Sequence, residues 1–176
     1  SLADGKVIWQ KELKFKLREL FPLSALLIAQ EFIPSPFDWR IGILDGKPLY
    51  ACKYFMARNH WQIYNWNANK SRASVGPVAT YLVEEAPPAV VDIALKAANA
   101  IGDGFYGVDV KEKDGNVYVI EVNDNPSIDH HWEDEILGEK LYDEIMENIL
   151  VRIQKARQMP AVDKQNSFEK SENLNK

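Results

Sequence analysis

Cysteine is almost absent from the chain, because Cys52 is the only one among 176 residues. A disulfide within the chain is therefore excluded, and a reducing cytoplasm is the expected location. Basic residues are also in the minority: 21 Lys and Arg stand against 26 Asp and Glu, which gives a net charge of −5. This balance argues against a nucleic-acid partner.

Long apolar runs are missing as well. No stretch is long enough to span a membrane and the N-terminus lacks a signal-peptide pattern, so we expect no membrane partner. Hydrophobic residues still make up 46% of the chain, enough for a sizeable core in one domain or in one lobe of a larger one. The first residue is Ser1 and not Met, which is typical of a fragment or an engineered product.

Hydrophobic periodicity predicts an α+β lobe in which helices flank a mostly antiparallel β-sheet. The expected elements are a short amphipathic helix at 9–21, a buried strand at 25–33, hairpins at 38–56 and 108–123, strands near 61–66 and 78–83, and helices at 87–101 and 133–157. The last helix is expected to bury Leu137, Leu141, Ile145, Ile149 and Ile153. Residues 158–176 are polar and are expected to be a disordered tail.

The second hairpin is the most informative segment. If Asp114-Gly115-Asn116 forms a three-residue loop, Lys113 pairs with Val117 and Asp109 lies opposite Glu121. One face of the ribbon then carries Asp109, Glu121 and Asn123. The other face is apolar and consists of Val108, Val110, Tyr118, Ile120 and Val122. A two-residue loop would instead turn Glu121 away from Asp109.

Two carboxylates opposite each other on neighbouring strands repel, so this register calls for a compensating cation. Hard oxygen ligands suit Mg²⁺ or Mn²⁺. The alternative is an exposed hairpin whose acidic face is simply solvated. Asn123 on the same face, followed at once by the polar run 124–127, favours a metal site formed by Asp109, Glu121 and Asn123.

The first hairpin turns at Asp45-Gly46, and a two-residue loop would pair Arg40 with Ala51 and Asp38 with Lys53. Asp38, Arg40 and Lys53 would then share one face, as a polyphosphate or acyl-phosphate pocket requires. The alternative is a cross-strand ion pair with Arg40 merely exposed. The backbone of residues 29–33 could contact an adenine edge while Phe32 or Ile33 packs on the base, although such apolar strands are more often core.

Four segments together resemble the C-terminal part of ATP-grasp ligases, in the group of RimK and prokaryotic glutathione synthetase. They are Gln30-Glu31-Phe32-Ile33, Asp38-Trp39-Arg40, Gly107-Val108-Asp109 and the run from Glu121 to Pro126. The resemblance covers residues 25–155. It implies an ATP- and Mg-dependent carboxylate–amine (or thiol) ligase, in which ATP phosphorylates a substrate carboxylate and an amine acceptor then displaces phosphate from the acyl phosphate.

The resemblance also implies residue roles. Gln30, Glu31, Phe32 and Ile33 would line the adenine and Asp38 would lie near the ribose. Arg40 and Lys53 would be catalytic cations, and Asp109, Glu121 and Asn123 would hold Mg²⁺ ions that bridge the phosphates. Residues 1–24 would be a remnant of the upstream ATP-grasp lobe with a short helix, and residues 25–157 the C-terminal lobe.

This sequence lacks the smaller lobe that supplies lysines and a glycine-rich loop in the family, so we expect a fragment that is inactive alone and that could form a homo-oligomer. A non-catalytic nucleotide- or metal-binding module of the same fold is the alternative. A third interpretation is a different metal centre at Asp129, His130, His131, Glu133 and Asp134, but a loop and helix start explains that run better.

Overall fold

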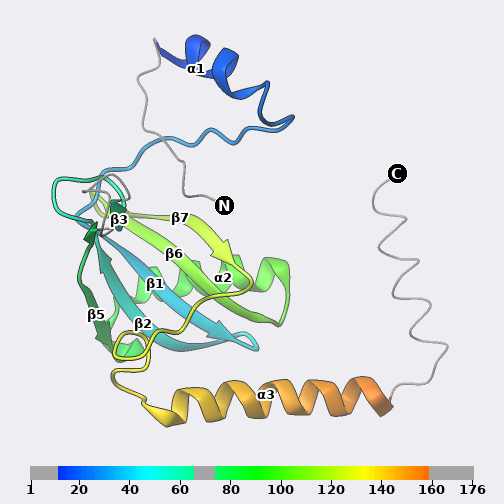
Figure 1. Cartoon of the computed structure of the whole chain (residues 1–176). Coiled ribbons are helices and arrows are strands. Elements are labelled where there is room, and N and C mark those ends of the chain that lie inside the picture. Colours follow the sequence, from blue (N-terminus) through cyan, green and yellow to red (C-terminus); the bar gives the residue numbers. More distant parts are fainter. Residues whose placement is uncertain (1–11, 66–73, 159–176) are drawn as a thin grey trace. The chain divides into compact units, whose positions relative to one another are not determined.

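The computed structural model describes residues 12–65 and 74–158, in two compact units that comprise residues 1–34 and 35–176 (Figure 1). In the first unit, helix α1 spans Leu13–Leu20, inside the helix expected at 9–21. The start of that expected helix and residues 159–176 of the predicted tail at 158–176 lie outside the described residues, while Gln158 is the last residue of helix α3.

The predicted buried strand at 25–33 is wrong. The segment has no regular secondary structure and is mostly exposed, with Leu26 at 77% and Ile28 at 82% of their full accessibility. A strand needs a neighbour to receive its backbone hydrogen bonds, and no strand of the described part of the chain pairs with this run. The apolar character of the sequence alone therefore does not make it a strand.

The second unit is built around a five-stranded sheet. Its strands lie in the order β5-β2-β1-β6-β7, and every neighbouring pair is antiparallel. Its strands are β1 (Phe37–Leu44), β2 (Lys47–Phe55), β5 (Val78–Tyr81), β6 (Phe105–Lys113) and β7 (Asn116–Asn123). Two short strands, β3 (Tyr64–Asn65) and β4 (Ser74–Val75), pair separately. The α+β class with a mostly antiparallel sheet is thus confirmed.

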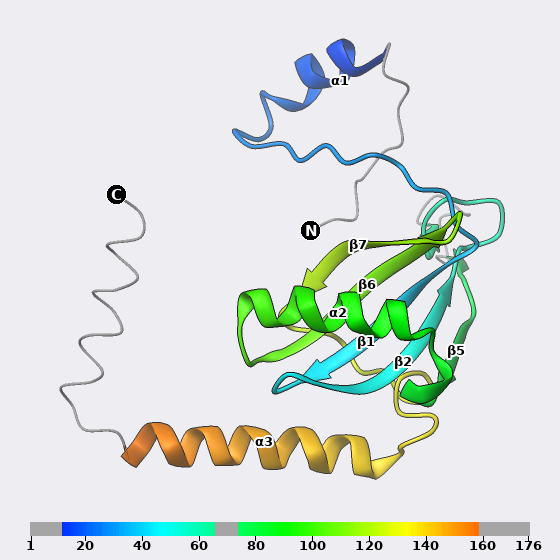
Figure 2. The ribbon, with the colours of Figure 1, turned by 180° about the vertical axis from the view of Figure 1, so that it is seen from behind.

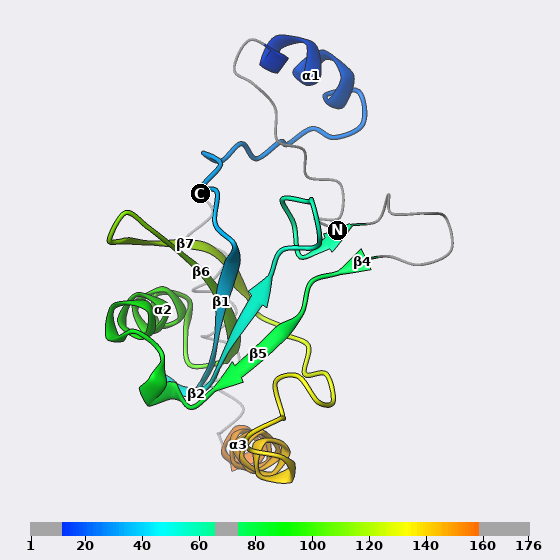
Figure 3. The same ribbon diagram turned by 90° about the vertical axis from the view of Figure 1, so that its left-hand side faces the viewer.

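Different elements cover the two faces of the sheet. Helix α2 (Pro88–Ile101) follows a short 3₁₀ helix (Val83–Glu85) and lies across one face (Figure 2). It buries Val90, Ala94 and Ala98, which share one side of the helix. On the opposite face runs the segment that links β7 to α3 (Glu139–Gln158), as the side view shows (Figure 3). Arg40, Asp109 and Glu121 lie on this second face, which also carries Cys52 and Tyr54.

The β6–β7 hairpin differs from the prediction at its turn and agrees with it at its far end. Lys113 pairs with Asn116, so the loop has two residues, and Asp114 and Gly115 both have positive φ (53° and 77°) as a type I′ turn requires. Asp109 pairs with Glu121, but the next residue of β6, Val110, pairs with Val119. One extra residue therefore lies between the two partners in β7, which is a β-bulge. This insertion restores Asp109 opposite Glu121.

The apolar face of this hairpin is therefore not the predicted one throughout. Val108 and Val110 are fully buried, as expected. From β7, however, the core receives Val117, Val119 and Val122, and Tyr118 is 39% exposed on the other side. The bulge lies at Ile120. Side chains of β7 alternate between the two faces of the sheet before Ile120 and after it, but not across it.

The β1–β2 hairpin agrees with the prediction at its turn and differs from it at its far end. Its two-residue turn at Asp45-Gly46 and the Leu44–Lys47 pair are confirmed. A bulge beside Gly42 then shifts the register by one, so that Arg40 pairs with Cys52 and Trp39 with Lys53. The predicted pairs of Arg40 with Ala51 and of Asp38 with Lys53 are wrong for this reason.

Helix α3 begins six residues later than expected, after Gly138 with φ of +57°. Leu141 and Ile145 are buried against the second face of the sheet. Ile149 and Ile153 are 41% and 44% exposed, so the prediction that they are buried is wrong. None of the described helices combines the length and apolar character that crossing a membrane would take.

Candidate functional site

One row of side chains crosses four neighbouring strands on the second face of the sheet. Cys52 of β2 lies opposite Arg40 of β1, Arg40 opposite Asp109 of β6, and Asp109 opposite Glu121 of β7. Residues paired in this way have neighbouring side chains on the same face. The row therefore brings together one predicted cation and two of the three predicted metal ligands.

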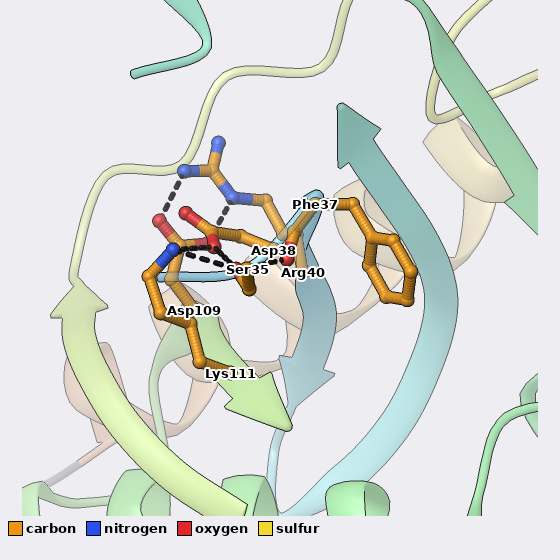
Figure 4. Close-up of polar contacts among 6 residues, drawn as sticks. All are labelled: Ser35, Phe37, Asp38, Arg40, Asp109 and Lys111. Carbon is orange, nitrogen blue, oxygen red and sulfur yellow. Dashed lines mark hydrogen bonds and ion pairs between the residues drawn. The ribbon is translucent and has the colours of Figure 1, made fainter. Parts of the chain in front are cut away.

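Arg40 and Asp109 form a bidentate ion pair at the centre of this row (Figure 4). Nε donates to Oδ1 and a terminal nitrogen donates to Oδ2, both at 2.8 Å, and the two side chains are only 14% and 11% exposed. Burial alone would lower the pKa of Arg40, but the hydrogen bonds and charge of Asp109 raise it above its ordinary value. The guanidinium is thus a fixed positive charge that occupies both oxygens of Asp109.

A second ion pair lies two residues further along the same two strands, on the same face. Lys111 Nζ donates to Asp38 Oδ1 at 2.5 Å and to Ser35 Oγ at 2.8 Å (Figure 4). Burial raises the pKa of Asp38, and the hydrogen bond and charge of Lys111 oppose that rise. The sequence analysis missed Lys111, although its place two residues after Asp109 in a strand puts it on the same face.

Lys53 is not part of this face. Its ammonium lies 4.5 Å from the ring centre of Phe37, 4.6 Å from that of Trp39 and 5.2 Å from that of Tyr81, on the side of the sheet that α2 covers. Such contacts stabilise a cation through the negative faces of the rings. The structure thus separates Lys53 from Arg40, which the predicted register had placed together.

Glu121 and Asn123 complete the predicted metal ligands on β7. Burial, followed by the negative charge of Asp109, raises the pKa of Glu121, and Arg40 partly opposes this rise. The side-chain oxygen of Asn123 accepts the backbone N–H of Asn125 at 3.0 Å. No group of three or more His, Cys, Asp or Glu side chains in the described ranges could hold a metal, so any cation here would rely on two carboxylates and one amide.

This donor set fits a hard divalent cation. Mg²⁺ takes oxygen ligands and is commonly held by one or two carboxylates, with the remaining positions left to phosphate oxygens and water. Burial is the first cause of the raised pKa of Glu121 and the negative charge of Asp109 is the second; a bound cation would compensate the repulsion between the two carboxylates.

Replacing Glu121 by glutamine should stabilise the metal-free protein at neutral pH. A raised pKa in the folded state means that the protonated carboxyl favours folding and that this contribution is lost as pH rises through the folded value. Glutamine does not ionise, so the stability of the variant does not fall in this way as the pH rises. Because Glu121 is only partly buried and solvent screens its charge, we expect a gain of about 0.5 kcal/mol at pH 7.

Urea unfolding at pH 7 and pH 4 checks this expectation. The difference between wild type and Glu121→Gln should be much smaller at pH 4, where the carboxyl is mostly protonated in both states. A variant that is less stable than wild type at pH 7 would show that Glu121 is not repelled by Asp109.

Two glycines allow side chains to lie close against this face. A Cβ at Gly42 would be 2.3 Å from the ring of Tyr50, and one at Gly107 would be 2.9 Å from Pro126. Tyr50 therefore packs directly over β1, and the segment after β7 packs directly over β6. Gly42 pairs with Gly107, and this pair lies two residues along the strands from the pair of Arg40 and Asp109.

The segment that covers the face is held by Asp134. Its carboxylate accepts the backbone N–H of His131 at 2.7 Å and the hydroxyl of Tyr142 at 3.0 Å, and it contacts Nδ1 of His130 at 2.8 Å. These bonds, that of His130 first, hold the pKa of Asp134 below its ordinary value. The expected loop at Asp129–Asp134 is present, but the helix starts only at Glu139.

The predicted adenine-contacting residues belong to the other unit. Gln30, Glu31, Phe32 and Ile33 lie in the segment without regular structure, and Phe32 is 42% exposed. Their contact with a nucleotide stays a prediction.

A family model described as the RimK-like ATP-grasp domain matches residues 23–149. Among solved structures, the chain is similar to D-alanine–D-alanine ligase from Bacillus anthracis, with 22% identity, a TM-score of 0.55, and coverage of 85% of this chain and 51% of that one. The same ligase complexed with ATP gives 21% identity, a TM-score of 0.54, and coverage of 85% and 50%.

A third similar structure is the ATP-grasp ligase PsnB complexed with minimal precursor, Mg and ADP. It shares 19% identity and a TM-score of 0.50, with coverage of 83% of this chain and 44% of that one. None of the curated proteins matches the chain. The chain thus spans about half the length of these ligases, and the likeness to them establishes a common fold.

Proposed function

The chain belongs to the RimK-like ATP-grasp domain family, and on this premise we propose that it is the metal- and phosphate-binding part of an ATP-dependent carboxylate–amine (or thiol) ligase. The observation that carries the proposal is the partly buried row of Arg40, Asp109 and Glu121, with Asn123 beside it at the sheet edge. We place the protein in the cytoplasm, where Cys52 stays reduced.

The proposed reaction has two steps. A carboxylate oxygen of the substrate attacks the terminal phosphorus of ATP, and ADP leaves to give an acyl phosphate. The nitrogen of an amine then attacks the acyl carbon, phosphate leaves with the bonding electrons, and the nitrogen loses a proton. Both steps concentrate negative charge on phosphate oxygens, so catalysis requires positioned positive charge more than a protein nucleophile.

Arg40 supplies one such charge. Its guanidinium is planar and can donate two parallel hydrogen bonds to a phosphate, as it now does to Asp109. Asp109, Glu121 and Asn123 would hold Mg²⁺, or Mn²⁺ in its place, which when bound neutralises phosphate charge. Lys53 receives no catalytic part in this proposal, because the rings of Phe37, Trp39 and Tyr81 hold it on the other face.

The proposal keeps Gln30, Glu31, Phe32 and Ile33 at the adenine on the strength of the sequence resemblance. In Asp38, Oδ1 accepts the bonds from Lys111 and Ser35, which leaves Oδ2 for a ribose hydroxyl. Lys111 thereby fixes the orientation of the carboxylate that would meet the ribose.

Calorimetric titration with ATP tests the proposal. We expect heat of binding with Mg²⁺ and none with EDTA, and we expect Glu121→Gln to weaken the Mg²⁺-dependent affinity at least tenfold, because a metal site of two carboxylates loses one of them. The matched control is Asp114→Asn, which removes one negative charge from the same hairpin at an exposed turn.

Equal loss of affinity in Asp114→Asn and Glu121→Gln would mean that only the net charge matters, and it would contradict a metal site at Glu121. Binding of ATP that is as tight in EDTA as in Mg²⁺ would support instead a nucleotide-binding module without the metal chemistry of a ligase.

A further inference from the structure

An apolar stripe lies exposed along helix α3. Its four side chains recur at spacings of three and four residues, so they share one side of the helix. They are Met146, Ile149, Leu150 and Ile153, and between 41% and 63% of each is exposed. Large apolar side chains that are exposed side by side form a contiguous patch, and such a patch marks an interaction surface where single exposed residues do not.

Helix α3 contacts the rest of the fold through a different side. Leu141 and Ile145 pack against the sheet, and they lie about a third of a turn around the helix from the stripe. In the second half of the helix, Arg152 forms ion pairs with Asp103 at 2.9 Å and with Asp45 at 3.6 Å. Both halves of the helix are thus attached to the fold, so the stripe is held away from the sheet.

The charges of α3 are divided between its two halves. The first ten residues carry four acids and one base, whereas the last ten carry three bases and no acid. The helix dipole favours this distribution within a single helix. Two of the charges also border the stripe on the same edge, Asp143 near its N-terminal end and Arg157 near its C-terminal end. Neither takes part in an ion pair within the described part of the chain.

We propose that the stripe binds the same stripe of a second copy of this chain, with the two α3 helices antiparallel. A two-fold axis that passes between Ile149 and Leu150 places each of these residues opposite the other one in the partner subunit. Met146 then lies opposite Ile153 of the partner subunit. Each copy thus contributes four apolar side chains to a closed, symmetric contact.

The charges decide between the two orientations of the second helix. In antiparallel helices with this axis, Asp143 lies beside Arg157 of the partner subunit, and the pair occurs twice. In parallel helices each acid would face the same acid and each base the same base, which is unfavourable. The charge pattern of α3 is therefore complementary to itself only when the second copy is antiparallel.

This dimer contact goes beyond the proposed function. It uses none of Arg40, Asp109 and Glu121, so it can form with or without ligase activity. A contact of one helix from each copy is at the small end of specific interfaces, and we therefore expect a dissociation constant of about 10 µM.

Sedimentation equilibrium of the full chain tests the contact. The wild type should change from monomer to dimer between about 1 and 100 µM. Ile149→Glu should weaken the dimer at least tenfold, because it puts a charge at the apolar centre of the contact. The matched control is Val151→Glu, which makes the same kind of change at a residue that is 45% exposed on the nearly opposite side of α3. It should alter the dissociation constant by about twofold or less.

Charge reversal tests the antiparallel orientation. Asp143→Arg and Arg157→Asp should each weaken the dimer about fivefold, because each replaces an attractive pair by a repulsive one. The double variant Asp143→Arg/Arg157→Asp restores the attraction with the signs exchanged, so its dissociation constant should return to within about twofold of the wild-type value. Thermal unfolding of each variant shows that it is folded before sedimentation.

Three results would overturn the proposal. A wild-type chain that stays monomeric throughout this concentration range leaves the stripe to another segment of the chain or to a different protein. A dimer that Ile149→Glu and Val151→Glu affect equally forms through another surface. A dimer that the double charge reversal does not restore, although each single reversal weakens it, does not pair its α3 helices in the antiparallel register.

Discussion

Replacing Asp109 by asparagine is expected to abolish Mg²⁺-dependent ATP binding and to lower the free energy of unfolding by about 3 kcal/mol. The metal would lose a charged ligand, which explains the first effect. The second arises because Arg40, 14% exposed, keeps its charge and loses its counter-ion. Removing one partner of a buried ion pair costs far more than removing both.

The double variant Arg40→Met/Asp109→Leu separates these effects. It should recover most of the stability, because the sheet then carries two apolar side chains in place of a lone buried charge, and it should still fail to bind Mg²⁺ and ATP. Urea unfolding followed by circular dichroism measures the stability, and calorimetry measures the binding. Wild-type stability in Asp109→Asn would show that the pair is solvated in solution.

The substitution Val119→Asp should lower the free energy of unfolding by about 3 kcal/mol, whereas Tyr118→Asp should lower it by about 1 kcal/mol or less. Val119 packs against the core beneath α2, and Tyr118 is 39% exposed on the other face. A charge at the first position is carried into an apolar interior without a partner, while a charge at the second stays in water.

The comparison of Val119→Asp with Tyr118→Asp also decides the register of β7. A regular hairpin with a three-residue loop buries Tyr118, so it requires the opposite order of effects. Thermal unfolding of the two variants and the wild type is sufficient. If Tyr118→Asp were the more damaging change, the bulge beside Ile120 would not exist in solution.

The two hairpins show what local sequence can and cannot determine. Asp45-Gly46 predicts a two-residue turn correctly, but the bulge beside Gly42 then moves Lys53 away from Arg40. Asp114-Gly115 makes the same turn where a longer loop was expected, and a bulge returns Glu121 to Asp109. A turn is specified by neighbouring residues, whereas a bulge follows from how the whole strand packs.

Tertiary packing also explains the remaining differences. Residues 25–33 have the composition of a buried strand but no strand partner in the described chain. Ile149 and Ile153 repeat at helical spacing, yet only Leu141 and Ile145 of α3 reach the sheet. Lys111 could have been found by strand alternation, because it lies two residues after Asp109 in the same strand.

The bulge in β7 has a consequence for how these molecules behave in concentrated solution. In the described sheet β7 is the last strand, so one side of its backbone has no strand beside it. An exposed regular edge can recruit the same edge of another molecule and start aggregation. The bulge breaks the even spacing of donors and acceptors next to Ile120. The irregularity that keeps Glu121 beside Asp109 thereby also helps to keep one molecule from adding its sheet to the next.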